Sequence, residues 1–134
     1  YAGMAADIIH YGHINLIRKA AKKGYLIVGV LSDKAIKSYK RKPIFTYKQR
    51  KFIIENIKGV KKVVKQNTLS YVSNLKKYKP SFVIHGNDWK KGSQKKTRED
   101  VINCLNIWGG KLIEVKYTKG ISTTFIINKL NKDK

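Results

Sequence analysis

The sequence predicts an α/β domain with a Rossmann-like, doubly wound parallel sheet and helices on both faces. Short apolar runs of strand length alternate with amphipathic segments of helix length along the chain, which is typical of βαβ units. The pair Gly109-Gly110 ends one helical segment just before the next apolar run. With 134 residues the chain has the size of one domain, so we assign residues 1–134 to a single domain.

The first half of the chain predicts two helices around one strand. Residues 14–21 continue a glycine-containing turn as a helix, and residues 25–31 form an apolar run typical of a strand. Residues 47–57 place their apolar side chains on one face of a helix. Residues 1–3 lead straight into a loop, with fewer residues than a first strand needs. We therefore expect that a few upstream residues are missing and that the chain is a piece of a longer protein, such as a domain of a fusion protein.

The second half of the chain continues the alternation. Strands are predicted at residues 62–64, 81–85 and 111–117, and helices at residues 69–78, 97–108 and 123–130. The helix at 97–108 ends at Gly109-Gly110 because glycine is a poor helix former. Ligands of such sheets bind at the carboxyl ends of the strands, near the point where the strand order reverses.

The chain is strongly basic, with a formal net charge of +22. Such a charge favours polyanion partners such as nucleic acid. However, only four residues are arginines, and the lysines are scattered without a dense run. We favour a solvated lysine-rich surface, and keep open a role of the charge in attracting anionic ligands. A basic nucleic-acid-binding domain remains the alternative of another class.

Cysteine content and hydropathy narrow the class further. Cys104 is the only cysteine, which excludes a disulfide scaffold and a cysteine-ligated metal site within this sequence. The longest apolar runs are far below a membrane-spanning length. We expect a cytoplasmic protein without a membrane partner.

Residues 7–13 form the most informative stretch of the sequence. His10 and His13 lie three residues apart, with Gly12 between them, at the opening of a helix. Glycine allows a phosphate to approach the backbone, and the free amides at the helix N-terminus favour an anion. Imidazole N–H groups there can stabilise charge on a phosphoryl group in transfer. Surface histidines or part of a metal site are the alternatives, although His85 is the only other histidine available to zinc.

A second candidate motif, residues 120–124, lies between a predicted strand and the last predicted helix. Ser122 or Thr123 can cap that helix. Hydroxyls and exposed amides at a helix N-terminus also suit a triphosphate. Capping and phosphate binding are compatible.

Together and in this order, the two motifs resemble the cytidylyltransferase branch of the HxGH nucleotidyltransferase superfamily, with HxGH early and ISTT late. The likeness extends to a basic loop at residues 40–43, a helix start at residues 47–50, and Gly86-Asn87-Asp88-Trp89 after a strand. It therefore covers nearly the whole chain in the correct order.

The resemblance implies in-line attack of an acceptor phosphate or phosphonate oxygen on the α-phosphorus of CTP, with pyrophosphate leaving. It assigns catalysis to His10, His13 and Lys42. It places the nucleotide at Gly3, Met4, Ala5, His10, His13, Gly86, Asp88, Thr118, Gly120, Ile121, Ser122, Thr123 and Thr124. It places the acceptor at Asp33, Lys40, Arg41, Lys42 and Trp89. Which residue of 40–42 contacts phosphate stays open, Trp89 equally suits core packing, and Asp33 suits a helix cap.

Two departures separate this chain from the glycerol-3-phosphate enzymes that it also resembles. The opening from Gly3 to Asp7 is one residue longer, and Tyr117 stands where those enzymes have an arginine. The segments 3–10, 38–41, 85–89 and 108–110 are instead similar to cytidylyltransferase domains of phosphonate biosynthesis, which are often fused to phosphoenolpyruvate mutase. The resemblance therefore favours a small phosphonate acceptor, of the 2-aminoethyl- or 2-hydroxyethylphosphonate type. Glycerol-3-phosphate, another phosphoalcohol, or ATP in place of CTP are the alternatives.

The resemblance also implies a cofactor and an assembly. Mg²⁺ is expected to be bound mainly through the nucleotide phosphates, with no dedicated metal ligands in the protein. A homodimer is expected, formed around residues 58–64.

Overall fold

The computed structural model describes residues 1–133, whose strands pair in one group of three and one group of two. Its strands are β1 (Ala2–Met4), β2 (Leu26–Leu31), β3 (Val60–Gln66), β4 (Phe82–Gly86) and β5 (Lys111–Val115). The pairs β1–β2, β2–β3 and β4–β5 are all parallel. Tyr1 joins the two halves, because its N-terminal nitrogen donates to the Phe82 carbonyl (2.9 Å) and its carbonyl accepts from the Ile84 N–H (3.0 Å). The strand order is therefore 3-2-1-4-5, with the reversal point between β1 and β4.

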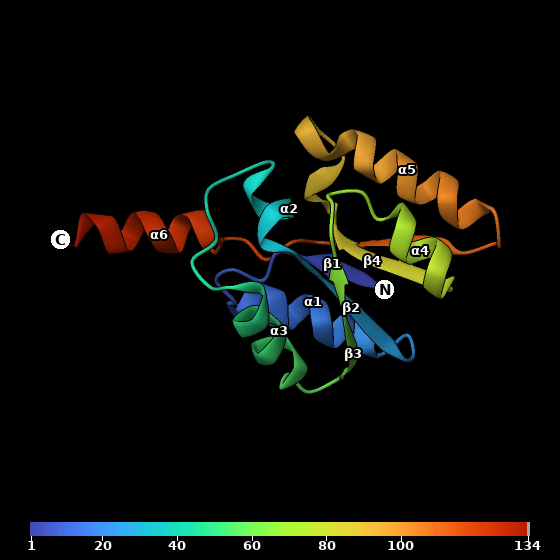
Figure 1. The fold of residues 1–134 in the computed structure, drawn as a ribbon, viewed down its shortest axis with the longest axis horizontal. Helices are drawn as coiled ribbons and strands as arrows, with labels where there is room; N and C mark the ends of the chain where they lie inside the picture. The colour runs from blue at the N-terminus through green and yellow to red at the C-terminus, as the bar shows by residue number, and fades with distance from the viewer. Residues whose placement is uncertain (134) are drawn as a thin grey trace.

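Helices cover both faces of this sheet, which confirms the predicted fold class (Figure 1). They are α1 (Tyr11–Ala21), α2 (Asp33–Lys37), α3 (Tyr47–Glu55), α4 (Val72–Tyr78), α5 (Lys95–Asn106) and α6 (Thr123–Lys132). In Figure 1, α1 and α3 lie on one side of the strands and α4 and α5 on the other, while α6 projects away from the body. Two short 3₁₀ turns, η1 (Asn87–Trp89) and η2 (Gly92–Gln94), lead from β4 into α5.

The core is divided between the two faces of the sheet. On the α1 side, Ile17 and Ile54 pack with Val28 and Val30. On the α5 side, Leu75, Val101 and Leu105 pack around Val83. Because apolar side chains cover both faces, β2 reads as a continuous apolar run, as buried parallel strands do.

The structure corrects the expected start of the fold. Residues 1–3 were expected to be too few for a first strand, but residues 2–4 form the central strand β1, hydrogen-bonded to β2 on one side and joined to β4 through Tyr1 on the other. Hydrogen bonds to the strands on both of its sides stabilise β1 despite its short length. The helix α2 was also not predicted, because its five residues show less than two turns of apolar periodicity.

Among the described residues, no helix is both long enough and apolar enough to cross a bilayer.

Candidate active site

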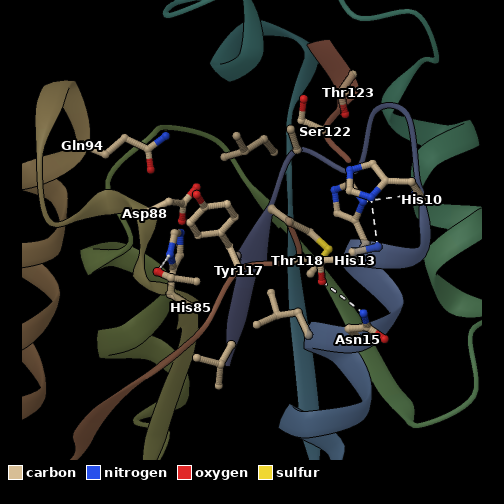
Figure 2. Close-up of a pocket in the computed structure, with 18 of the residues that line it drawn as sticks. His10, His13, Asn15, His85, Asp88, Gln94, Tyr117, Thr118, Ser122 and Thr123 are labelled. Carbon is tan, nitrogen blue, oxygen red and sulfur yellow. Dashed lines mark hydrogen bonds between the residues drawn. The ribbon is translucent and has the colours of Figure 1, made fainter. Parts of the chain in front are cut away.

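One cavity of about 510 Å³ lies at the carboxyl ends of the strands, over the reversal point between β1 and β4 (Figure 2). Both sequence motifs line it. The predicted site residues in its lining are Gly3, Met4, Ala5, His10, His13, Lys40, Gly86, Asp88, Thr118, Ile121, Ser122 and Thr123. We call residues 7–13 the histidine turn and residues 120–124 the hydroxyl turn. In Figure 2, His10 and His13 of the first turn and Ser122 and Thr123 of the second lie at one end of the cavity, and His85 and Asp88 lie at the other.

The histidine turn is a capping box built from two imidazoles. His10 is the N-cap of α1, and its Nδ1 accepts a hydrogen bond from the Gly12 N–H (3.0 Å). The Nδ1 of His13 accepts in turn from the His10 N–H (3.2 Å). An Nδ1 that accepts a hydrogen bond carries no proton, so each neutral ring bears its proton on Nε2. The fold thus supplies two Nε2–H donors, with ring centroids 4.1 Å apart.

Both rings stay neutral at physiological pH. Burial lowers the pKa of His10. Burial, together with the neighbouring His10 and Lys40, lowers the pKa of His13 to about 4. Each neutral ring can therefore donate its Nε2–H in a hydrogen bond to a phosphate. Neither ring carries the second proton that a general acid would release.

Gly12 is required by the close packing of this turn. A Cβ on Gly12 would lie 2.7 Å from Cε1 of His10 and 3.5 Å from Cγ2 of Ile121. The second distance places Ile121 of the hydroxyl turn next to Gly12 of the histidine turn.

The hydroxyl turn is held against the histidine turn by side-chain hydrogen bonds. The Ser122 hydroxyl caps α6 by accepting from the Phe125 N–H (3.0 Å). The Thr123 hydroxyl donates to the Ile8 carbonyl (3.2 Å), and Asn15 donates to the Thr118 hydroxyl (3.1 Å). Segments more than 100 residues apart thus form one surface, at which the N-termini of α1 and α6 meet.

The basic loop is fastened by the buried carboxylate of Asp7. That carboxylate accepts from Arg41 Nη1 (3.0 Å), from the Ile44 N–H (2.8 Å) and from the Phe45 N–H (3.1 Å), while Arg41 Nη2 donates to the Asp7 carbonyl (2.6 Å). Burial alone would raise the pKa of Asp7, but these donors hold it below its usual value. The loop that follows Tyr39 is therefore fixed to the segment that carries His10.

This attachment decides which residue of 40–42 faces the cavity. Lys40 lines it, and burial together with the nearby Arg41 lowers the pKa of the Lys40 ammonium. Arg41 pairs with Asp7 (3.0 Å) and anchors the loop, and its expected phosphate contact stays a prediction. Lys42 lies outside the lining, and its catalytic assignment stays a prediction that the geometry of this loop does not favour.

Four other predicted residues lie outside the lining. Asp33 is the first residue of α2, where Ser32 is the cap, and its carboxylate pairs with the buried Arg50 (2.7 Å). Trp89 is buried beneath the ring of His85, which favours the packing role, and its contact with the acceptor stays a prediction. Gly120 and Thr124 flank the lining without joining it.

Two further lining residues, His85 and Gln66, were not assigned to the site from the sequence. His85 stacks on Trp89 with ring centroids 3.5 Å apart, and its Nδ1 lies 2.8 Å from the Gly86 carbonyl, to which it donates. Gln66 is buried at the end of β3 and bonds the Tyr1 hydroxyl. His85 lies in the matched segment 85–89 without an assigned role, and Gln66 matches no motif, so only the three-dimensional arrangement places them in the site.

The donor set of the cavity is suited to anions. Three lysines (Lys19, Lys40 and Lys116) line it against one carboxylate, Asp88. Within residues 1–133, no group of three or more histidine, cysteine, aspartate or glutamate side chains is placed to hold a metal ion. One carboxylate fits a magnesium ion that is carried by phosphates better than one held in a protein cage.

Comparison with known proteins identifies the family of this site. Residues 1–129 match the model of the family described as Cytidylyltransferase-like. An ethanolamine-phosphate cytidylyltransferase of Mus musculus is 36% identical over 129 residues, covering 92% of this chain and 30% of that protein. A glycerol-3-phosphate cytidylyltransferase of Staphylococcus aureus is 32% identical over 126 residues, covering 92% of this chain and 88% of that protein.

The solved structures agree on the fold. A lipopolysaccharide core biosynthesis protein of Thermoplasma volcanium superposes with a TM-score of 0.72 at 24% identity, covering 87% of this chain and 95% of that chain. The domain belongs to the Cytidylyltransferase-like family. It spans about a third of the length of the ethanolamine-phosphate relatives that it matches.

Proposed function

We propose that this domain transfers CMP from CTP to the phosphate of a small phosphoalcohol and releases pyrophosphate. The observation that carries the proposal is the meeting of two Nε2–H imidazole donors with the hydroxyl-capped N-terminus of α6 in one cavity. Such groups stabilise the charge of a triphosphate, which positive dipole ends and N–H donors favour.

In the proposed reaction, an oxygen of the acceptor phosphate attacks the α-phosphorus of CTP in line. The bond from that phosphorus to the β-phosphate oxygen breaks, and the electron pair leaves with pyrophosphate. His10 and His13 donate hydrogen bonds to the phosphate oxygens on which charge develops, and Lys40 draws the two anions together. Mg²⁺, when bound to the phosphates, supplies further charge neutralisation.

The acceptor is proposed from the relatives. The matched proteins are named for ethanolamine phosphate and for glycerol-3-phosphate, which favours a phosphoalcohol over the phosphonate expected from segments 3–10 and 85–89. A phosphonate has the same attacking oxygen, so the same site would serve it, and both classes belong in the test.

The test measures pyrophosphate release from CTP and Mg²⁺ with a panel of phosphoalcohols and phosphonates, and with ATP in place of CTP. Removing one preorganised donor commonly lowers turnover by about 10²–10³-fold, so we expect His10→Ala and His13→Ala each to lose that much. The control is Tyr25→Ala. Tyr25 is 69% exposed and lies just before β2, at the amino ends of the strands, whereas the cavity lies at their carboxyl ends. No release with any acceptor would refute the proposal.

The alternative of a nucleic-acid-binding domain predicts a different outcome. It requires DNA or RNA binding that weakens steeply with salt and that survives both histidine substitutions. The homodimer, the magnesium requirement and the cytoplasmic location remain proposals. They are tested by sedimentation, by EDTA inhibition and by localisation of a tagged protein.

A further inference from the structure

His85 differs from the other two histidines of the cavity in the atom that it offers to a ligand. Its Nδ1 lies 2.8 Å from the Gly86 carbonyl oxygen. A carbonyl oxygen only accepts, so Nδ1 carries the proton of the neutral ring and Nε2 carries none. Burial lowers the pKa of His85 and so favours the neutral ring. His10 and His13 thus present Nε2–H donors, whereas His85 presents an Nε2 atom that accepts.

The Nε2 atom of His85 is open to the cavity. Among residues 1–133 it has no hydrogen-bond partner, and no fully buried side-chain nitrogen or oxygen of these residues lacks one. Because His85 lines the cavity, its free Nε2 is accessible from there. A ligand that fills the cavity without a matching donor would leave this atom unpaired, which costs free energy.

The ring of His85 is held in one orientation from beneath. It stacks on Trp89 with an angle of 5° between the two ring planes. The Trp89 indole N–H donates to Glu114 (2.9 Å), which also accepts two hydrogen bonds from Arg98 (2.8 and 3.1 Å). A phenylalanine ring could stack on Trp89 in the same way without exposing a polar atom. Packing alone therefore does not require a histidine here.

The groups around His85 suit a neutral ligand that carries hydroxyl groups. The charged groups that act on the pKa of His85 are two carboxylates, Asp88 and Glu114, and Asp88 also lines the cavity. Figure 2 shows Asp88 and His85 together, at the end of the cavity away from the histidine turn. The other polar side chains that the turns after β4 and the start of α5 add to the lining are neutral: Ser93, Gln94 and Thr97. A carboxylate disfavours a phosphate, so this end suits the nucleoside part of the nucleotide.

We propose that His85 selects ribonucleotides, because its Nε2 accepts a hydrogen bond from one ribose hydroxyl while Asp88 accepts from the other. The inference rests on the proposed function and adds a specificity-determining residue to it. Two neighbouring accepting groups match the two neighbouring donors of the ribose diol. The phosphoalcohol is left the end beside Lys40, whose charge helps to lower the pKa of His13.

Nitrogen-15 NMR of the histidine rings tests where the nucleoside binds. In the presence of Mg²⁺, tripolyphosphate should shift the ring signals of His10 and His13 alone, whereas CTP should also shift that of His85. A CTP titration that leaves only His85 unshifted would overturn the inference and leave the proposed function intact. A shift of His85 by ethanolamine phosphate alone would assign this end to an ammonium group and would also overturn it. No shift of any ring with CTP would overturn both proposals.

Deoxy analogues test the hydrogen bonds themselves. The dissociation constants of CTP, 2′-deoxy-CTP and 3′-deoxy-CTP are measured by calorimetry without a phosphoalcohol, so the result does not depend on turnover. Each missing hydroxyl should weaken binding about ten-fold or more, because it leaves one accepting group of the protein unpaired. Equal dissociation constants for the three nucleotides would overturn the inference.

A matched pair of variants isolates the contribution of His85. His85→Phe keeps a ring on Trp89 but removes Nε2, and His85→Gln keeps an oxygen that can accept. The Phe variant should bind CTP about ten-fold more weakly and should no longer distinguish CTP from one of the two deoxy analogues, whereas the Gln variant should still distinguish both. Full discrimination against both analogues in a Phe variant with the wild-type Tm would contradict the role of His85. If the Phe variant does not fold, the titrations of the wild-type protein still decide the inference.

Discussion

The attachment of the basic loop by Asp7 can be tested through stability. Asp7→Asn keeps the shape of the side chain but leaves one oxygen where two oxygens now accept three hydrogen bonds from Arg41, Ile44 and Phe45. The new carboxamide NH₂ group then faces an N–H group of the loop, which is also a donor. At least one hydrogen bond to the charged carboxylate is therefore lost. At about 1.5–3 kcal/mol for such a bond, plus the uncompensated Arg41, we expect a loss of about 2–4 kcal/mol in the free energy of unfolding.

The assay is urea unfolding at pH 7, with Asp100→Asn as the matched control. Asp100 pairs with Lys96 on the surface of α5, an i,i+4 pair whose Lys96 side chain is 80% exposed, so its loss should cost far less stability than the loss of the buried Asp7 carboxylate. Asp7→Asn should also lower turnover, because the loop that carries Lys40 loosens. If the two variants lose equal stability, the buried carboxylate does not fasten the loop.

Three further predictions follow from the same turns. The pKa of His13 is about 4 when folded and about 6.5 when unfolded; the unfolded chain therefore binds more protons between these values, and stability should fall by up to about 3 kcal/mol as pH drops from 6.5 to 4. In urea unfolding at a series of pH values, His13→Gln should make the free energy of unfolding depend less on pH. Part of the dependence should remain, because His10 contributes in the same direction. An unchanged dependence on pH would exclude the burial of His13. Gly12→Ala should displace the His10 ring and lower kcat at least ten-fold while the circular dichroism spectrum stays unchanged; wild-type kcat would show that the close contact is relieved elsewhere. Ser122→Ala should lower stability by about 1 kcal/mol through loss of the α6 cap, and a thermal melt with no shift would contradict the capping role.

Much of the fold was predictable because its signals are local. The apolar run of β2 and the one-sided pattern of α3 identify themselves in the sequence. The strand β1 was missed because its three residues are stabilised by neighbours on both sides, and those neighbours come from residues 26–31 and 82–86. The length of an apolar run therefore does not predict whether a strand forms at the centre of a sheet.

The candidate site was predictable where function depends on a motif, and not where it depends on a loop. The two turns bear their glycines, imidazoles and hydroxyls in recognisable order, and the structure brings them together. Lys40, Arg41 and Lys42 are adjacent cations that the sequence cannot tell apart. The buried carboxylate of Asp7, 34 residues from Arg41, determines which of them faces the cavity.

The central claim is that His10 and His13 present two neutral Nε2–H donors to one triphosphate. Nitrogen-15 NMR of the histidine rings, recorded at pH 7 during titration with CTP and Mg²⁺, tests it most directly. We expect Nε2–H tautomers for both rings and a shift of both ring signals on addition of CTP, but not on addition of cytidine. A protonated Nδ1 on either ring, or a CTP titration that leaves one ring unshifted, would contradict it.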